Sequence, residues 1–156
     1  MGIDPGHPTA VKVCVLSSCG GHLTEVLALR AAYADHDHFF VLNERVMLPD
    51  EMAGRTTFVA HSERDWRFLV NLWEAWRILA NQRPDVILTT GAGLAVPFAL
   101  IAKLRRVPVV FVEISAFVEE PSLTGRIMHR LADRLFYQWE GLGRHFPRGT
   151  FGGSLL

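Results

Sequence analysis

A glycine-containing segment at residues 17–22 combines the polar side chains and the backbone freedom that an anion site needs. It reads Ser-Ser-Cys-Gly-Gly-His and lies between an apolar run and a helical pattern. Adjacent glycines let the backbone approach a ligand closely, and free N–H groups at a helix start attract phosphate or diphosphate. The predicted ligand contacts are Ser18, Gly20, Gly21 and His22. The alternative is a tight turn without a ligand, and Glu25 in the first helical turn would mildly oppose an anion.

His22 is also a candidate for proton transfer. The positive end of the helix dipole is expected to lower its pKa and to keep the imidazole neutral. A neutral imidazole can act as a general base. The alternative is a structural or surface histidine, which is the preferred interpretation of His36 and His38.

A second glycine turn, at residues 89–93, reads Thr-Thr-Gly-Ala-Gly and also leads from a predicted strand into a predicted helix. Fold geometry is expected to place it beside the first turn, so that the two together make a better anion cradle. Its predicted ligand contacts are Thr90, Gly91 and Gly93. The alternative is a turn that serves packing alone.

Glu113 ends the apolar run Val-Pro-Val-Val-Phe-Val-Glu. A carboxylate at the carboxyl end of a strand, facing a cleft, can act as a base or accept a hydrogen bond from a sugar hydroxyl. The alternative is a solvated loop residue. The tripeptide Asp35-His36-Asp37 has D-x-D spacing, but it precedes a predicted strand and its histidine is interpreted as a surface residue, so neither a metal nor a cofactor is predicted.

A helical stretch at residues 66–81 is apolar over more than one face and has only a narrow polar stripe. Packing on a sheet explains one face of such a helix. Tryptophan with flanking arginine is typical of a membrane interface. The predicted membrane-facing residues are Trp66, Phe68, Trp73 and Trp76. The alternative is a wholly structural helix.

Composition limits the class of protein. The chain has 156 residues, of which 49% are apolar, and its 16 basic residues balance 16 acidic ones. Residues 11–156 are expected to form one domain behind a flexible leader at 1–10. The charge balance lacks the basic footprint of a duplex-binding protein, so no nucleic-acid partner is predicted. Two cysteines favour a reduced, cytoplasmic protein. Residues 86–102 are the longest stretch without charge, but a glycine turn and Pro97 interrupt them, so they are interpreted as a strand, a turn and a helix and not as a membrane span.

Short apolar runs alternate with longer helical stretches, which predicts an α/β fold: a Rossmann-like, mostly parallel sheet with helices on both faces. Strands are expected at residues 11–16, 39–42, 57–60, 86–89, 109–112 and 135–137. Helices are expected at 22–33, 66–81, 94–104 and 122–131. In such sheets ligands bind at the carboxyl ends of the strands, so the loops at 17–22, 89–93 and 113–124 should meet there.

Five segments taken in order resemble one family. They are SSCGGHLTEVLAL, DVILTTGAGLAVPFALIAKL, VPVVFVEISAF, PSLTGRIMHRLADRLFYQWE and FGGSLL, and the resemblance covers essentially all of residues 11–156. The set resembles the bacterial PssD/CpsF polysaccharide-biosynthesis proteins. These are similar to the eukaryotic subunit that anchors the second GlcNAc transferase of dolichol-linked oligosaccharide synthesis. A more distant likeness is to the MurG transferase of peptidoglycan synthesis.

The resemblance implies the amino-terminal, acceptor-binding half of a GT-B glycosyltransferase, with the donor-binding catalytic half on a separate chain. The reaction would transfer a sugar of the GlcNAc, Gal or GlcA type, with inversion, from a UDP-sugar held mainly by the partner to a polyprenyl-diphosphate-linked sugar. The chain alone would be inactive. Glu113 is the first choice for the base and His22 the second. The residues expected to face the partner are Ser122, Thr124, Arg126, Gln138, Trp139, Leu155 and Leu156.

Eukaryotic members carry an amino-terminal membrane span that is not found in this sequence. Attachment is therefore expected to be peripheral, at the cytoplasmic face of the plasma membrane. A second hypothesis is a non-catalytic scaffold that recruits a catalytic partner to the membrane. A third is a Rossmann enzyme that binds a nucleotide by itself, against which the missing G-x-G-x-x-G argues.

Overall fold

The computed structural model describes residues 11–43, 48–60 and 67–155, and these contain one parallel sheet. Its strand order is β3-β2-β1-β4-β5-β6-β7, and every neighbouring pair is parallel. The strands are β1 (Lys12–Ser17), β2 (Asp37–Leu42), β3 (Thr56–Phe58), β4 (Val86–Thr89), β5 (Val109–Val112), β6 (Arg134–Tyr137) and β7 (Thr150–Phe151). The predicted α/β, Rossmann-like class is confirmed. The chain order reverses between β1 and β4, the kind of position at which open α/β sheets bind ligands.

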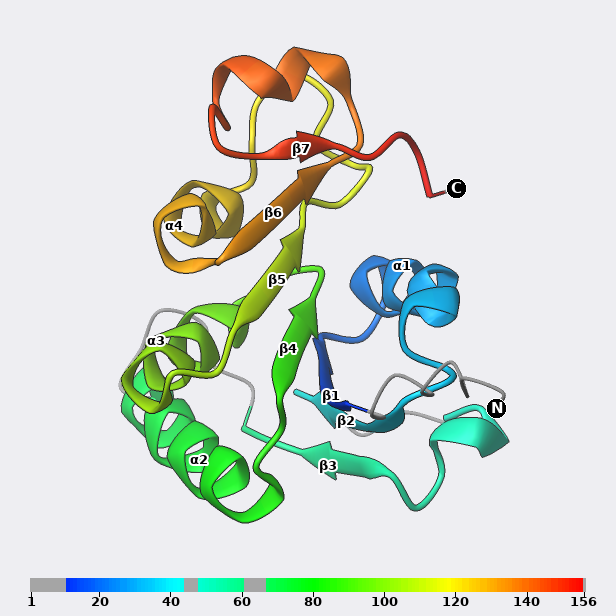
Figure 1. Cartoon of the computed structure of the whole chain (residues 1–156), viewed down its shortest axis with the longest axis vertical. Helices are drawn as coiled ribbons and strands as arrows, with labels where there is room; N and C mark the ends of the chain where they lie inside the picture. Colours follow the sequence, from blue (N-terminus) through cyan, green and yellow to red (C-terminus); the bar gives the residue numbers. More distant parts are fainter. Residues whose placement is uncertain (1–10, 44–47, 61–66, 156) are drawn as a thin grey trace, which may run out of the picture.

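Helices cover both faces of the sheet, as predicted. In Figure 1, α2, α3 and α4 lie on one face and α1 lies on the other. The α-helices are α1 (Gly21–Ala28), α2 (Arg67–Gln82), α3 (Ala95–Arg105) and α4 (Leu123–Leu131). Short 3-10 helices are η1 (Leu29–Ala32), η2 (Asp50–Met52) and η3 (Glu140–Arg144). Two buried apolar clusters correspond to the two faces of the sheet.

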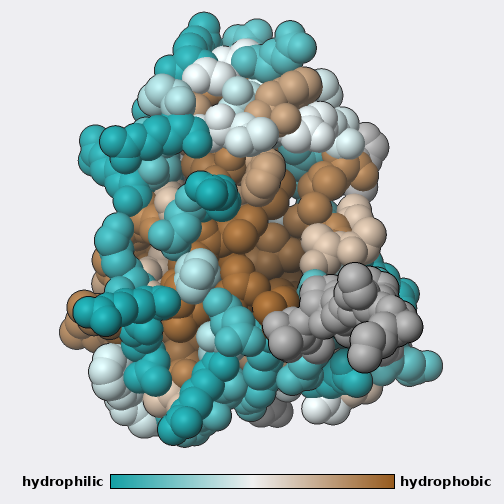
Figure 2. Space-filling view, in the orientation of Figure 1, coloured by the Kyte–Doolittle hydropathy of each residue, from teal (hydrophilic) through white to brown (hydrophobic). Residues whose placement is uncertain are grey.

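The buried strands read as unbroken apolar runs because both of their faces are covered. In β1, Cys14 and Leu16 belong to the cluster beneath α2, α3 and α4, whereas Val13 and Val15 belong to the cluster beneath α1. β4 and β5 divide their side chains in the same way. Apolar residues gather in the centre of Figure 2, where these two strands run between the helices of the two faces. The sheet is thus a packed support whose carboxyl edge carries the site loops.

α3 is apolar nearly all round because it packs on three sides. It contacts α2 and α4 as well as the sheet, and most of its residues are buried. Pro97 is accommodated in the first turn, where no backbone N–H is needed. The composition of this helix is therefore explained by packing, although Leu104 at its end is 73% exposed.

The differences from the predicted elements concern short segments. The helix expected at 22–33 ends at Ala28 and continues as η1, and neither η3 nor β7 is predicted. β7 has two residues, which is too short for any alternation pattern to show. The predicted leader at 1–10 lies outside the described residues, as do Trp66 and Leu156.

Candidate functional site

The loops that follow β1 and β4 are tied together by His22 and Thr90. The His22 Nδ1 atom lies 3.0 Å from the Thr90 carbonyl oxygen, and the Thr90 hydroxyl donates to the His22 carbonyl oxygen at 3.1 Å. β1 and β4 are neighbours in the sheet, as are β4 and β5. The predicted meeting of the loops at the carboxyl edge is thereby confirmed for the first two.

The hydrogen bond from His22 fixes its tautomer. A carbonyl oxygen can only accept, so Nδ1 carries the proton and Nε2 of the neutral ring keeps its lone pair. Burial lowers the pKa of His22, while the Thr90 carbonyl and the negative charge of Glu25 act in the opposite direction. The shift has the predicted direction, and burial is the largest of its causes.

The start of α1 is open. Gly20 has a φ of 88°, which favours glycine, and no side chain caps the helix. A Cβ atom built on Gly20 or Gly21 would meet no heavy atom of the described residues within 4 Å. Both glycines are exposed, whereas Ser18 and His22 are half-buried. Exposed N–H groups beside free space at a helix start are suited to an anion.

The second glycine turn packs against His22, and its polar groups are mostly bonded within the protein. The Gly91 N–H donates to the Thr89 hydroxyl at 3.1 Å, and Thr90 is fully buried with its hydroxyl bonded to His22. Gly91 has a φ of 109°, and a Cβ there would lie 3.5 Å from His22 Cε1. The prediction that Thr90 and the Gly91 N–H contact a ligand is therefore wrong, because both are used internally. Gly93 is exposed.

Glu113 does not face an open cleft. Its side chain is 1% exposed. Glu113 Oε2 accepts from the Ser122 N–H at 3.2 Å and the Ser122 hydroxyl at 3.0 Å, and Oε1 accepts from the Ile114 N–H at 3.3 Å. Burial raises the pKa of Glu113 above its ordinary value, against the lowering effect of these bonds. The expectation that the Glu113 carboxylate faces a cleft is therefore wrong, because the loop after β5 folds back onto it.

The same contacts place Glu113 beside the start of α4. The Ser122 hydroxyl also accepts from the Gly125 N–H at 2.8 Å and so caps the helix. A Cβ atom at Gly125 would overlap Glu113 Oε2, and a Cβ atom at Gly91 would lie 3.7 Å from Thr124. The loops at 89–93 and 113–124 therefore meet through α4, which confirms the predicted convergence of all three loops.

The residues expected to face a partner are mostly engaged within the chain. Ser122 caps α4, and Thr124 is half-buried near Gly91. Gln138 is 3% exposed, so the prediction that it faces a partner is wrong. Its amide is held inside by residues of three other segments. Leu155 is half-buried against the cluster beneath α1.

Two residues of that set do reach the surface. Trp139 is 36% exposed, and its indole N–H donates to the Ser115 carbonyl at 2.7 Å. Arg126 is exposed and pairs with Glu120 at 2.9 Å. A partner could therefore contact Trp139 and Arg126 without rearrangement of the described residues.

Glu25 is a site residue that the sequence did not reveal. It is 3% exposed, and its Oε1 atom accepts from the Ser115 N–H at 2.9 Å and the Ser115 hydroxyl at 2.7 Å. Oε2 accepts from Gln138 at 2.6 Å. The available signal was its spacing of three residues from His22, which places both on one side of the helix. Its carboxylate is bonded inside the protein, while its negative charge still acts on His22 at the helix start.

α2 carries an exposed apolar face. Leu69, Trp73 and Trp76 are 67%, 59% and 50% exposed and recur at i, i+4 and i+7, and with Leu104 of α3 we call them the α2 aromatic face. The Arg77 guanidinium lies 4.8 Å from the Trp73 ring, and that of Arg105 lies 5.2 Å from the Trp76 ring. Phe68 is half-buried. Within the described residues, no helix has the length and apolarity needed to cross a membrane.

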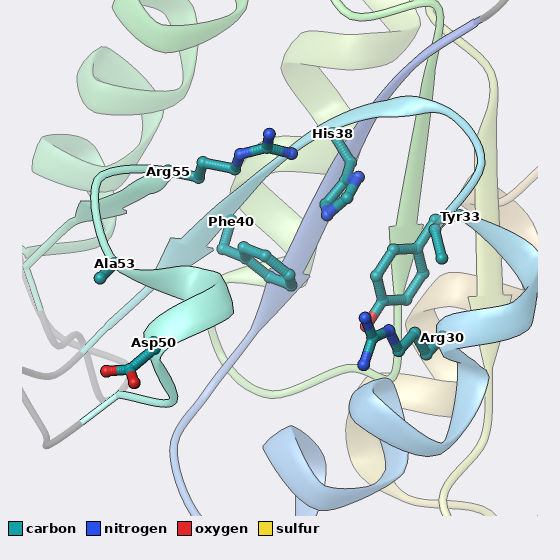
Figure 3. A pocket seen from close by; sticks show the side chains of 8 residues that line it. Arg30, Tyr33, His38, Phe40, Asp50, Ala53 and Arg55 are labelled. Atoms are coloured by element: carbon teal, nitrogen blue, oxygen red, sulfur yellow. The ribbon is translucent and has the colours of Figure 1, made fainter.

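A separate cavity of about 330 Å³ lies among η1, β2 and η2 (Figure 3). The rings of Tyr33, His38 and Phe40 meet edge to face there, with centroids 5.2–6.0 Å apart. In Figure 3 the Arg55 side chain extends toward His38. The cavity is lined by Arg30, Tyr33, Ala34, His38, Phe40, Asp50, Ala53 and Arg55. None of the predicted site residues lines it, so it is distinct from the His22 site.

Solved structures with the same fold are about twice as long as this chain. A UDP-N-acetylglucosamine 2-epimerase from Rickettsia bellii matches with a TM-score of 0.74 at 16% identity, over 94% of this chain and 45% of that one. MurG from Acinetobacter baumannii matches with a TM-score of 0.68 at 16% identity, over 83% and 41%. This chain thus spans less than half of either structure, and the likeness confirms the Rossmann-like half of a GT-B fold.

Sequence relatives are more specific. The human UDP-N-acetylglucosamine transferase subunit ALG14 is 26% identical over 94% of this chain and 84% of its own length, and the rat protein of that name is 30% identical over 96% and 87%. The UDP-N-acetylglucosamine–N-acetylmuramyl-(pentapeptide) pyrophosphoryl-undecaprenol N-acetylglucosamine transferase of Symbiobacterium thermophilum is 38% identical over 51% of this chain and 20% of its own. Residues 54–155 match the family described as oligosaccharide biosynthesis protein Alg14 like. The chain belongs to this Alg14-like family.

Proposed function

We propose that this chain is the acceptor-binding subunit of a two-chain inverting glycosyltransferase. The enzyme would transfer a sugar of the GlcNAc, Gal or GlcA type from a UDP-sugar to a polyprenyl-diphosphate-linked sugar. The observation that carries the proposal is the position of His22, which is half-buried at the crossover between β1 and β4 beside an open helix start. Relatives named as transferase subunits support it.

The acceptor diphosphate would bind at the start of α1. Gly20 and Gly21 expose their backbone to free space, and the first N–H groups of a helix carry partial positive charge. The Glu25 carboxylate leaves the N–H groups at the helix start available, because Ser115 and Gln138 occupy its two oxygens inside the protein. His22, at the same helix start, would lie beside the sugar that the diphosphate carries.

We propose that His22 Nε2 is the base that accepts the proton of the acceptor hydroxyl. In an inverting transfer the hydroxyl oxygen attacks the anomeric carbon, the bond to UDP breaks, and a base takes the hydroxyl proton. His22 has the required tautomer and a lowered pKa. Glu113, the first choice from the sequence, is buried with both oxygens engaged, so we give it the role of holding the start of α4.

The donor half and the UDP-sugar would be supplied by the partner chain. In a GT-B enzyme the donor half closes over the carboxyl ends of the strands, where Trp139 and Arg126 are exposed. The direct test is transfer from a UDP-sugar to a polyprenyl-diphosphate acceptor, measured with this chain alone, the partner alone and the mixture. Activity in the mixture only is expected. Robust turnover by this chain alone would contradict the proposal.

A membrane role rests on the α2 aromatic face. Leu69, Trp73 and Trp76 are each at least 50% exposed. An arginine guanidinium lies against each of the two tryptophan rings. Aromatic residues beside basic ones suit the interface of an anionic membrane. We propose peripheral attachment there, at the cytoplasmic face of the plasma membrane. This face also supports the second candidate, a scaffold that recruits a catalytic partner without contributing a base.

A further inference from the structure

The Gln138 side chain joins three segments that are far apart in the sequence. Its Nε2 atom donates to Glu25 Oε2 at 2.6 Å and to the Glu113 carbonyl oxygen at 3.1 Å. Its Oε1 atom accepts from the Leu155 N–H at 2.9 Å. Gln138 therefore connects α1, the end of β5 and the segment 152–155 that follows β7.

These three bonds determine which way the amide faces. Both hydrogens of the NH₂ group meet acceptors, and the carbonyl oxygen meets a donor. A flipped amide would place its oxygen against the Glu25 carboxylate and its NH₂ group against the Leu155 N–H. A glutamate at position 138 would bring two carboxylates together. Because the group is buried, a partner left without its hydrogen bond would be destabilising.

The segment 152–155 reaches Gln138 from the edge of the sheet. The Gly152 N–H donates to the Tyr137 carbonyl at 2.9 Å, and Gly153 has a φ of 76°, a turn conformation that favours glycine. Figure 1 shows the chain after β7 turning toward the side on which α1 lies. The Leu155 side chain packs on the cluster beneath α1, and its N–H meets Gln138.

The connection continues from Gln138 toward His22. Glu25 holds Ser115 through the N–H and the hydroxyl of that residue. Glu113 is held at its carbonyl by Gln138, and its carboxylate holds Ser122 at the start of α4. The negative charge of Glu25 also acts on His22. Gln138 and Glu25 thus link the segment 152–155 both to the loop 113–115 and to α1, the helix that carries the proposed catalytic histidine.

We propose that Gln138 is a positioning residue that couples the segment 152–155 to the loop 113–115. Loss of the Leu155 N–H contact would free the Gln138 amide, loosen its hold on Glu25 and the Glu113 carbonyl, and release the Ser115 N–H. Its effect on turnover rests on the proposed function above, whereas the structural coupling does not. A partner that moved this segment would thereby change the site.

Amide hydrogen exchange on the full chain tests the coupling without any partner. Leu155→Pro removes the N–H that Gln138 accepts, whereas the matched variant Leu155→Ala keeps it and shortens the same side chain. The Ser115 amide should exchange about fivefold faster in Leu155→Pro than in Leu155→Ala, the factor expected for loss of one hydrogen bond. Amides of β1 exchange by global unfolding and give the change in global stability, so the Ser115 rate is compared with theirs in each variant.

Gln138→Leu provides an independent test from the other side of the contact. It should accelerate exchange at the Ser115 and Leu155 amides together, relative to the β1 amides. Equal Ser115 exchange in Leu155→Pro and Leu155→Ala would overturn the coupling. Acceleration of every amide in Gln138→Leu by one common factor would show a global effect only and would also overturn it.

Turnover in the pair with the donor-binding partner tests the catalytic consequence. Leu155→Pro should have a several-fold lower kcat than Leu155→Ala with little change in KM for the acceptor. Any loss of partner contact by the leucine side chain is common to both variants. If exchange at Ser115 responds but kcat does not, the coupling stands and its link to the proposed site is contradicted.

Discussion

His22 and Thr90 exchange two hydrogen bonds across the strands at which the order of the sheet reverses. One joins His22 Nδ1 to the Thr90 carbonyl at 3.0 Å, and the other joins the Thr90 hydroxyl to the His22 carbonyl at 3.1 Å. Their sequence separation is 68 residues, so the pair ties the first turn of α1 to the loop after β4. The imidazole is thereby held in one orientation and one tautomer before any ligand binds. General base catalysis requires a base that is positioned in this way.

The pKa of His22 should lie below its ordinary value of 6.5. Burial disfavours the charged imidazolium and outweighs the opposing effects of the Thr90 carbonyl and Glu25. The ring is then neutral at pH 7 and gains its proton only as the pH falls below 6.5. An NMR titration of the imidazole Cε1–H signal, assigned by its absence in His22→Gln, measures this. A midpoint above 6.5 would contradict the burial argument.

Thr90→Val should destabilise the fold by about 1–3 kcal/mol, because it leaves the His22 carbonyl without its buried donor. Valine keeps the shape of threonine, so lost packing contributes little. Thr90→Ser retains the hydroxyl and removes one methyl group, and it should restore the hydrogen bond. Urea unfolding of both variants gives the comparison. A valine variant as stable as the wild type would show that the Thr90 hydroxyl is unimportant.

Gly125→Ala should be destabilising by about 1–3 kcal/mol, since its Cβ overlaps the Glu113 carboxylate. The better helix propensity of alanine acts in the opposite direction. The matched background is Glu113→Ala, in which the overlapping atoms are absent. In that background Gly125→Ala should cost far less, and a double-mutant cycle measures the difference. Additive free energies would mean that Gly125 and Glu113 do not constrain each other.

The strands and glycine turns could be predicted because their signals are local. β1, β4 and β5 are apolar runs, and the first two end in residues that begin a glycine turn. The hydrogen-bond partners of the buried polar side chains could not be predicted from local signals. Glu25 meets Ser115 and Gln138 at separations of 90 and 113 residues, and no local pattern encodes such contacts. For the same reason the sequence predicts that Gln138 faces a partner and that Glu113 faces a cleft, whereas both are buried.

Gly91 shows a finer limit of sequence reasoning. The turn at 89–93 was predicted correctly, and the φ of 109° at Gly91 explains the glycine. Its N–H, however, donates to Thr89 rather than to a ligand. A glycine turn therefore indicates close approach to the backbone, but in this chain the nearest groups at Gly91 are the side chains of Phe111 and His22.

Membrane binding should depend on the α2 aromatic face. Trp73→Ser combined with Trp76→Ser should reduce flotation with vesicles that contain anionic lipid, because both rings are at least half exposed. Arg77→Gln and Arg105→Gln should each weaken binding by about 1 kcal/mol and reduce its salt dependence. Phe151→Ser, which alters an exposed aromatic residue of β7, is the matched control. Unchanged flotation of the tryptophan variants would make this face purely structural.

The decisive measurement is turnover by the pair of chains with His22→Ala, beside acceptor affinity and co-purification of the partner. Loss of a general base typically lowers the rate by about 10²–10⁴. We expect a loss in that range for His22→Ala, with weaker acceptor binding, an intact pair, and a near-normal rate in the control His36→Ala. Glu113→Gln should lose less, because its amide oxygen can still accept from Ser122. Near-normal turnover of His22→Ala would contradict the assignment of the base to His22. A collapse of turnover in Glu113→Gln alone would show that Glu113 is the base. Normal rates in both variants would support the second hypothesis, a non-catalytic scaffold.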